Sequence, residues 1–222
     1  MSTFKVICME ITRSMNCRDI TKCDVVDSMG VKIGKIGDMT FTFDGRLNLS
    51  QFILAGSRVE EFLESVKIKP DRDPMFDASI IRIIGDEVRL NTQANSLKTT
   101  LDEDAIPAGE IRWSELQKRE IVDKDDVKVG KAVDIDFELD GTASLIVGGG
   151  MIEETLEAIG LKSDIDIIVP CATIESMGEK IKLKVTKEEL KLTMDEALDG
   201  DAIRRAHKQK SGYKVHLLHT KP

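Results

Sequence analysis

The sequence predicts a mainly β protein made of two tandem small β-barrels, each with about five or six strands and one short helix. Three observations lead to this fold class: an internal repeat, runs in which apolar and polar residues alternate, and Asp-Gly pairs that end these runs. Alternation with a period of two is typical of half-buried strands. Closing such a sheet into a barrel removes its unpaired edges.

The internal repeat covers most of the chain. Residues 17–45 align without a gap with residues 113–141 at an offset of 96, and residues 58–90 align with residues 151–183 at an offset of 93. A match of this length indicates a duplication of one module. The best-matched residues of the two copies are Asp27 and Asp123, Val31 and Val127, Lys32 and Lys128, Gly34 and Gly130, Asp38 and Asp134, Phe41 and Phe137, Asp44 and Asp140, and Gly45 and Gly141.

Each copy opens with an alternating run that predicts antiparallel strands with one buried and one polar face. The expected buried face holds Val31, Ile33, Met39, Phe41 and Phe43 in the first copy, and Val127, Val129, Val133, Ile135, Phe137 and Leu139 in the second. The expected polar face holds Lys32, Asp38, Thr40 and Thr42, and then Lys128, Asp134, Asp136 and Glu138. Because the polar faces differ, we expect the two copies to bind different surfaces.

Four glycines have expected structural roles. Gly34 and Gly130 interrupt the alternation, and a glycine inside a strand usually marks a bulge or a bend. Gly45 and Gly141 each follow an aspartate, and Asp-Gly supplies the positive φ of a tight hairpin turn.

The remaining segments complete the predicted organisation. Helical spacing of apolar residues predicts helices over residues 59–66 and 152–159. We expect a first barrel over residues 1–91 with an extra N-terminal strand at 3–11, a polar linker over 92–112, a second barrel over 113–192, and a basic tail over 193–222. In the tail, residues 194–207 predict a helix and residues 213–218 a strand.

Composition narrows the function classes. The net charge of −8 argues against a general nucleic-acid-binding role, because neutralising phosphates requires clustered Lys and Arg. The four cysteines (Cys8, Cys17, Cys23 and Cys171) form no Cys-x-x-Cys pair and are expected to be reduced thiols. We expect a cytoplasmic protein, because the sequence shows no secretory leader and no apolar run of the ~18 residues that a membrane span needs.

The motifs resemble the PRC-barrel family, whose small barrels are SH3-like. The second copy carries Ser114-x-Leu116, Ile121-Val122-Asp123 and Val129-Gly130-Lys131, then the Asp-Gly hairpin, and it closes with Val169-Pro170, Ile174 and Gly178. The first copy keeps Val25-Val26-Asp27 and Ile33-Gly34-Lys35, but it has Asp77 in place of Pro170 and Arg18 and Ile20 in place of the Ser-x-Leu opening. The resemblance covers roughly residues 17–91 and 113–186.

The resemblance implies binding rather than catalysis. PRC-barrels occur in a reaction-centre subunit, in a ribosome maturation factor, and in archaeal cell-division proteins that associate with one another and with the SepF/FtsZ machinery. A tandem copy without a catalytic domain looks most like the archaeal group. It implies a protein partner, such as another PRC-barrel protein or a division-ring component, and allows a homodimer; because fold does not fix function, this remains an expectation.

Chemical sites are weakly indicated, and we expect no catalytic residue, metal or cofactor. Gly148-Gly149-Gly150 leads from a strand into a helix, as phosphate-binding loops do, but Glu153 and Glu154 in the first helical turn would repel a phosphate. A tight turn is therefore favoured over a nucleotide or small-ligand site. The acidic pairs Asp71 and Asp73, and Asp164 and Asp166, are interpreted as solvated loop charges rather than metal ligands, and His207, His216 and His219 as surface residues.

Two groups of residues are candidates for partner binding. From residue 202 onward the tail has six basic residues and no acidic one, so it is either a solvated helix end or a contact for RNA, anionic lipid or an acidic partner. The candidate contacts to an anionic partner are Arg204, Arg205, Lys208, Lys210 and Lys214. The candidate apolar interface residues are Phe52, Phe62, Met151 and Tyr213.

Three hypotheses follow. The first is a non-enzymatic adaptor with two PRC-type barrels in an archaeal cell-division or similar assembly, in which tandem modules raise avidity. The second is a ribosome maturation or RNA-associated factor that uses the basic tail, with binding that falls steeply with salt. The third is a small-ligand or nucleotide binder at Gly148–Gly150, which ligand-induced thermal stabilisation would reveal.

Overall fold

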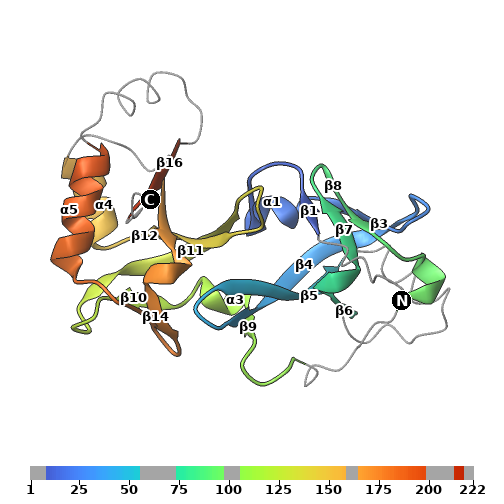
Figure 1. Ribbon diagram of the computed structural model, residues 1–222, viewed down its shortest axis with the longest axis horizontal. Coiled ribbons are helices and arrows are strands. Elements are labelled where there is room, and N and C mark those ends of the chain that lie inside the picture. The colour runs from blue at the N-terminus through green and yellow to red at the C-terminus, as the bar shows by residue number, and fades with distance from the viewer. Residues whose placement is uncertain (1–8, 56–73, 98–105, 159–164, 199–212, 218–222) are drawn as a thin grey trace, which may run out of the picture. The chain divides into compact units, whose positions relative to one another are not determined.

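A computed structural model describes residues 9–55, 74–97, 106–158, 165–198 and 213–217. The protein is mainly β, with a few short helices, and its two sequence halves form two curled mixed sheets that are half-barrels (Figure 1). The chain divides into two compact units: Met1–Thr42, Asn48–Ser114 and Phe137–Thr142 form the first, and Phe43–Leu47, Glu115–Asp136 and Ala143–Pro222 form the second. Each unit therefore contains a short hairpin segment from the other sequence half.

The first sheet has the strand order β1-β7-β8-β3-β4-β5-β6, and β9 adds to β4 outside this path. The strands are β1 (Glu10–Ile11), β3 (Asp24–Val26), β4 (Lys32–Phe43), β5 (Leu47–Ala55), β6 (Met75–Asp77), β7 (Ile81–Ile84), β8 (Glu87–Leu90) and β9 (Ile111–Arg112). Short helical segments lie between them: α1 (Cys17–Ile20), η1 (Ala78–Ile80) and η2 (Ala94–Ser96). A two-residue strand, β2 (Met15–Asn16), precedes α1.

The second sheet repeats this order as β14-β15-β10-β11-β12-β13, and β16 extends it beyond β13. The strands are β10 (Glu120–Val122), β11 (Lys128–Phe137), β12 (Ala143–Gly148), β13 (Ile165–Pro170), β14 (Ile174–Met177), β15 (Ile181–Leu183) and β16 (Tyr213–His216). The helical segments are α3 (Trp113–Leu116), α4 (Met151–Ala158), η4 (Cys171–Thr173) and α5 (Lys187–Leu198). The shared order agrees with the duplication inferred from the sequence.

The glycine predictions are confirmed where strands bend and turn. The β3–β4 register shifts between Val25, opposite Gly34, and Val26, opposite Lys32. The β10–β11 register shifts in the same way opposite Gly130 and Lys128. Gly45 and Gly141 have φ of 97° and 83°, the left-handed conformation expected in these hairpin turns.

The predicted antiparallel pairing of the alternating strands is confirmed for β3–β4 and β10–β11, whereas the prediction of one polar face is wrong. Parallel pairs, which the alternation does not predict, close each sheet, β3 with β8 and β10 with β15. Thr40, Asp134 and Asp136 are buried although their positions predicted a solvated face, whereas Val31, Val127 and Leu139 are exposed. Both faces of the long strands are covered where the sheets curl, and the valines lie in turns, so alternation alone does not decide burial here.

The aliphatic core is anchored by aromatic rings. Phe52 and Phe76 lie opposite each other on β5 and β6 with ring centroids 5.8 Å apart, and both are buried. In the first unit, Phe41 stacks on Phe137 at 6.1 Å. Offset aromatic pairs of this kind add about 0.5–1.5 kcal/mol beyond the burial of their apolar area.

The helices differ in part from their predicted ranges. The helix expected at 152–159 is α4, which contacts β12, whereas the helix expected at 59–66 lies outside the described residues. The tail helix was predicted at 194–207, but α5 begins at Lys187. A capping box sets this start, because Glu189 accepts from the Thr186 amide at 2.7 Å and Thr186 Oγ1 accepts from the Glu189 amide at 3.1 Å.

Candidate functional site

Two matched turns, β3–β4 in the first half and β10–β11 in the second, present exposed apolar side chains. Val31 is 55% exposed, and its repeat partner Val127 is 46% exposed. Met29, in the first turn, is 71% exposed. We call residues 27–31 and 123–127 the paired turns. Exposed valines at one position in both copies make this position a candidate contact surface.

A buried aspartate fixes each of the paired turns. Asp27 Oδ1 accepts from the amides of Met29 and Val31, each at 2.8 Å. Asp123 Oδ1 accepts from the amides of Asp125 at 2.9 Å and Val127 at 2.8 Å. The turn thus receives from the side chain the acceptor that its amides need, which is the geometry in which aspartate favours turns.

The second oxygen of each aspartate ties the turn to a segment farther along the chain. Asp27 Oδ2 accepts from the Ala94 amide at 3.0 Å, at the start of η2, and Asp123 Oδ2 accepts from the Lys187 amide at 2.9 Å, at the start of α5. Ala94 and Lys187 are separated by the repeat offset of 93. The sequence pointed to both aspartates as matched residues, but it gave no sign of these distant partners.

These hydrogen bonds keep both carboxylates charged despite burial. Burial by itself would raise the pKa of Asp27, but the backbone amides of Ala94, Val31 and Met29 outweigh it and hold the pKa below the ordinary value. For Asp123, burial is likewise outweighed by the amides of Lys187, Val127 and Asp125, and the pKa is also lowered. Both groups therefore act as fixed anions in structural turns.

Ion pairs at matched positions flank the paired turns. Lys32 lies 2.7 Å from Asp24 on the neighbouring strand, and Lys128 lies 2.5 Å from Glu120. Hydrogen bonds from these lysines lower the pKa of Asp24 and of Glu120. Each half thus has an exposed valine followed directly by a paired lysine.

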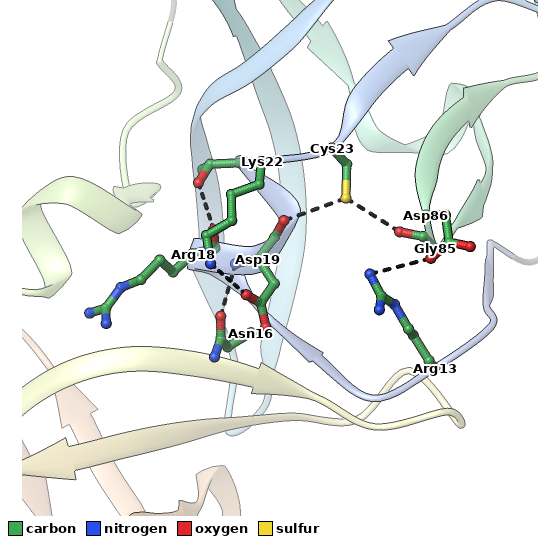
Figure 2. A network of polar contacts seen from close by, with 9 residues as sticks. Arg13, Asn16, Arg18, Asp19, Lys22, Cys23, Gly85 and Asp86 are labelled. Carbon is green, nitrogen blue, oxygen red and sulfur yellow. Dashed lines mark hydrogen bonds and ion pairs between the residues drawn. The ribbon is translucent and has the colours of Figure 1, made fainter. Parts of the chain in front are cut away.

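A second polar network surrounds the buried thiol of Cys23. Figure 2 shows Cys23 Sγ between the backbone carbonyls of Asp19 and Gly85, at 3.4 and 3.3 Å, with Arg13 reaching Asp86 at 3.5 Å. Nearby, Asn16 caps α1 by accepting from the Asp19 amide at 2.9 Å. Burial raises the pKa of the Cys23 thiol, which opposes formation of the nucleophilic thiolate.

The matched position in the second half identifies the role of Cys23. There, Arg119 Nη1 donates to the carbonyl of Gly178 at 2.6 Å, and Gly178 is the repeat partner of Gly85. The Cys23 thiol in the first half and the Arg119 guanidinium in the second half thus bond to carbonyls at matched positions. This arrangement is a structural cap for a hairpin turn.

The Gly148-Gly149-Gly150 segment has the tight backbone packing that its interpretation as a tight turn requires. Gly149 and Gly150 have φ of 74° and 54°. A Cβ at Gly130 would lie 2.6 Å from the Gly148 carbonyl oxygen, and one at Gly150 would lie 2.9 Å from the Val129 oxygen. Close approach of two backbones accounts for these glycines without a ligand.

Of the four residues predicted to form an apolar interface, the structure contradicts two. Phe52 is fully buried and Met151 is 4% exposed, so the prediction that they form an exposed apolar surface is wrong. Phe52 instead stacks in the core, where the β5–β6 pairing directs it inward. Phe62 lies outside the described residues, and Tyr213 begins β16.

The basic tail is described only at its end. Arg204, Arg205, Lys208 and Lys210 lie outside the described residues. Lys214, on β16, forms an ion pair with the buried carboxylate of Asp136. Lys214 therefore contributes to the packing of the second unit rather than extending toward an anionic partner.

The remaining predicted sites give no metal centre among the described residues. No group of three His, Cys, Asp or Glu side chains there could hold a metal ion. Asp71, Asp73, Asp164, His207 and His219 lie outside the described residues, whereas Asp166 is on β13 and His216 on β16. Of the helices in the described ranges, none is long and apolar enough to cross a membrane.

Comparison with known proteins identifies no family for this chain. No protein-family model matches the chain, and no curated protein matches it.

Proposed function

We propose that this protein is a non-enzymatic adaptor that binds protein partners through its paired turns. The observation that carries the proposal is the exposure of Val31 and Val127 at one repeat position, each on a turn fixed by a buried aspartate. An apolar residue on a pre-ordered turn binds with little loss of conformational entropy, and two such turns in one chain raise avidity.

The environment of the thiols also supports binding over catalysis. Cys17, Cys23 and Cys171 are buried, and burial raises the pKa of Cys171 to about 12. The buried carboxylates of Asp27 and Asp123 are occupied in holding turns. The resemblance to PRC-barrel proteins suggests a cytoplasmic, archaeal cell-division assembly or a similar one as the setting, with another barrel protein or a division-ring component as partner.

The test compares three full-length baits in affinity capture from the native cytoplasm, at near-physiological and at high salt. They are the wild type, the double variant Val31→Asp with Val127→Asp, and the control Leu192→Asp, which changes an exposed leucine on α5 outside the repeat. Mass spectrometry identifies the captured proteins. We expect a salt-resistant partner set that the wild type and the control retain and the double variant loses.

Two results would overturn the proposal. Equal capture by the double variant and the control would show that the paired turns do not bind. Capture of ribosomal proteins and RNA that disappears at high salt would favour the RNA-associated alternative, because phosphate contacts weaken steeply with salt.

A further inference from the structure

The outer edge of β7 in the first unit is covered by the N-terminal strand β1. β1 runs parallel to β7, with Glu10 opposite Ile83 and Ile11 opposite Ile84. The pairing continues with a hydrogen bond from the Thr12 amide to the Ile84 carbonyl at 3.0 Å. Ile11 and Ile84 are both buried beneath this contact.

The second unit contains the same edge without such a cover among the described residues. β14 ends its sheet path and pairs with β15 in the register in which β7 pairs with β8, including a shift at the same place. Met177, the repeat partner of the fully buried Ile84, is half-buried, and Ser176, the partner of Ile83, is exposed. The matched edge is thus formed and open to solvent in the described part of this unit.

The sequence explains why the segment that precedes the second copy does not supply a cover there. Ile106 and Pro107 occupy the positions that match Glu10 and Ile11 at the offset of 96. Pro107 has no amide hydrogen and is followed by a turn, which the Glu110 amide closes on the Pro107 carbonyl at 3.1 Å. A turn in place of a strand leaves this segment unable to pair as β1 does.

Charge indicates what the open edge accepts. In the first unit, Arg13 follows β1 and pairs with Asp86 at 3.5 Å. Glu179 is the repeat partner of Asp86, and Glu175 stands on β14 where β7 has Arg82. Both glutamates are exposed, so these two positions are more acidic than their counterparts on the covered edge, while the Arg119 guanidinium also lies at this edge, bonded to the Met177 and Gly178 carbonyls.

We propose that β14 binds an extended segment of a partner protein as an added parallel strand. The segment has an aliphatic residue followed two positions later by Arg or Lys, as Ile11 is followed by Arg13. Backbone hydrogen bonds along the strand provide affinity, and the basic residue meets Glu179. The Met177 carbonyl accepts from Arg119 Nη1 at 3.3 Å, but a carbonyl oxygen has two lone pairs and retains capacity for the strand.

This inference rests on the proposed function, since it names a partner class for an adaptor, but it uses a surface distinct from the paired turns. The experiment titrates the full-length, isotopically labelled protein with a synthetic peptide of residues 9–14 and follows backbone amide NMR signals. We expect shifts concentrated at residues 174–179. A peptide with Arg13→Glu is expected to bind about two- to fivefold more weakly, the scale of one exposed ion pair.

Charge reversal makes the test specific. Glu179→Lys is expected to weaken the original peptide and to restore binding of the Arg13→Glu peptide, whereas the control Glu157→Lys, at an exposed position of α4, leaves both unchanged. The double variant Val31→Asp with Val127→Asp is expected to bind the peptide normally, so failure of the turns and failure of the edge are distinguishable. Shifts at residues 83–86, no shifts at about 1 mM peptide, or no effect of Glu179→Lys would each overturn the proposal.

Discussion

Cys23 and Arg119 occupy matched positions in the two halves, and each caps the carbonyl of a matched glycine. Cys23 Sγ lies 3.3 Å from the oxygen of Gly85, and Arg119 Nη1 lies 2.6 Å from the oxygen of Gly178. Two side chains of very different size and charge thus bond to matched backbone carbonyls, each beside a hairpin turn. A buried carbonyl without a partner costs about 1–3 kcal/mol, which is a sufficient reason for a donor beside the buried Gly85, whereas Gly178 is exposed and its carbonyl is also within reach of water.

The first prediction concerns thiol reactivity. The described thiols are buried, and burial raises the pKa of Cys23 and raises that of Cys171 to about 12. At pH 8 only about one Cys171 in 10⁴ is then a thiolate, the reactive form. We expect iodoacetamide to label Cys17, Cys23 and Cys171 at least about 100-fold more slowly in the folded protein than in urea, measured for each peptide by mass spectrometry. Equal rates in the two states would contradict the structural role.

The second prediction concerns the aspartates of the paired turns. Asp27→Ala and Asp123→Ala each remove an acceptor of three backbone amides. We expect each variant to lose about 3 kcal/mol of unfolding free energy in urea titration, since hydrogen bonds to a buried charge are worth about 1.5–3 kcal/mol. Asp125→Ala, at an exposed residue of the same turn, is the control and is expected to change stability by less than about 0.5 kcal/mol.

The third prediction is the pH dependence of stability. The folded-state pKa values of Asp27 and Asp123 are lowered, so the unfolded chain takes up protons first as the pH falls. Their stabilisation is fully present above the ordinary pKa of aspartate, about 4, and is lost as the pH falls through the lowered folded values. We expect the double variant Asp27→Asn with Asp123→Asn to show a flatter loss of unfolding free energy below pH 4 than the wild type. Parallel curves would show that other groups dominate acid unfolding.

The fourth prediction concerns the conformation of the second paired turn. Asp126 has φ of 63°, and among the described residues it is the one non-glycine with a positive φ. Its repeat partner, Gly30, has φ of 82°. We expect Asp126→Gly to raise the unfolding free energy by roughly 0.5 kcal/mol, since relief of the left-handed strain exceeds the loss of the exposed ion pair with Lys182. Asp125→Gly, at a neighbouring residue without positive φ, is expected to destabilise; a loss in both variants would refute the strain argument.

The fifth prediction distinguishes a core residue from a surface residue. Phe52→Ala removes a fully buried ring that stacks on Phe76, and we expect it to cost about 3–5 kcal/mol of unfolding free energy. Leu139→Ala changes an exposed leucine that the alternating pattern predicted to be buried, and it is expected to cost less than about 0.5 kcal/mol. Thermal and urea unfolding of the two variants would measure the difference. A similar cost for both would contradict the observed burial.

The candidate site was only partly predictable from the sequence. Asp27 and Asp123 stand out because the repeat matches them, and their turns follow from local hydrogen bonding two to four residues ahead. The exposure of Val31 and Val127 was not predictable from alternation, because a valine in the turn before a strand has the same sequence signature as one inside it. The roles of Cys23 and Arg119 became visible only when the matched carbonyls were compared.

The sequence by itself determined the duplication, the mainly β class, the hairpin glycines and the helix α4, because these depend on local period and on the conformational range of single residues. Only the tertiary structure decided the parallel strand pairs, the burial of Thr40, and the contact of Glu110 with Ser50 at 2.6 Å across 60 positions. It also decided that β1 covers β7 while the described part leaves β14 open. Such contacts join residues far apart in the chain, so their partners are fixed by packing of the whole fold rather than by neighbouring residues.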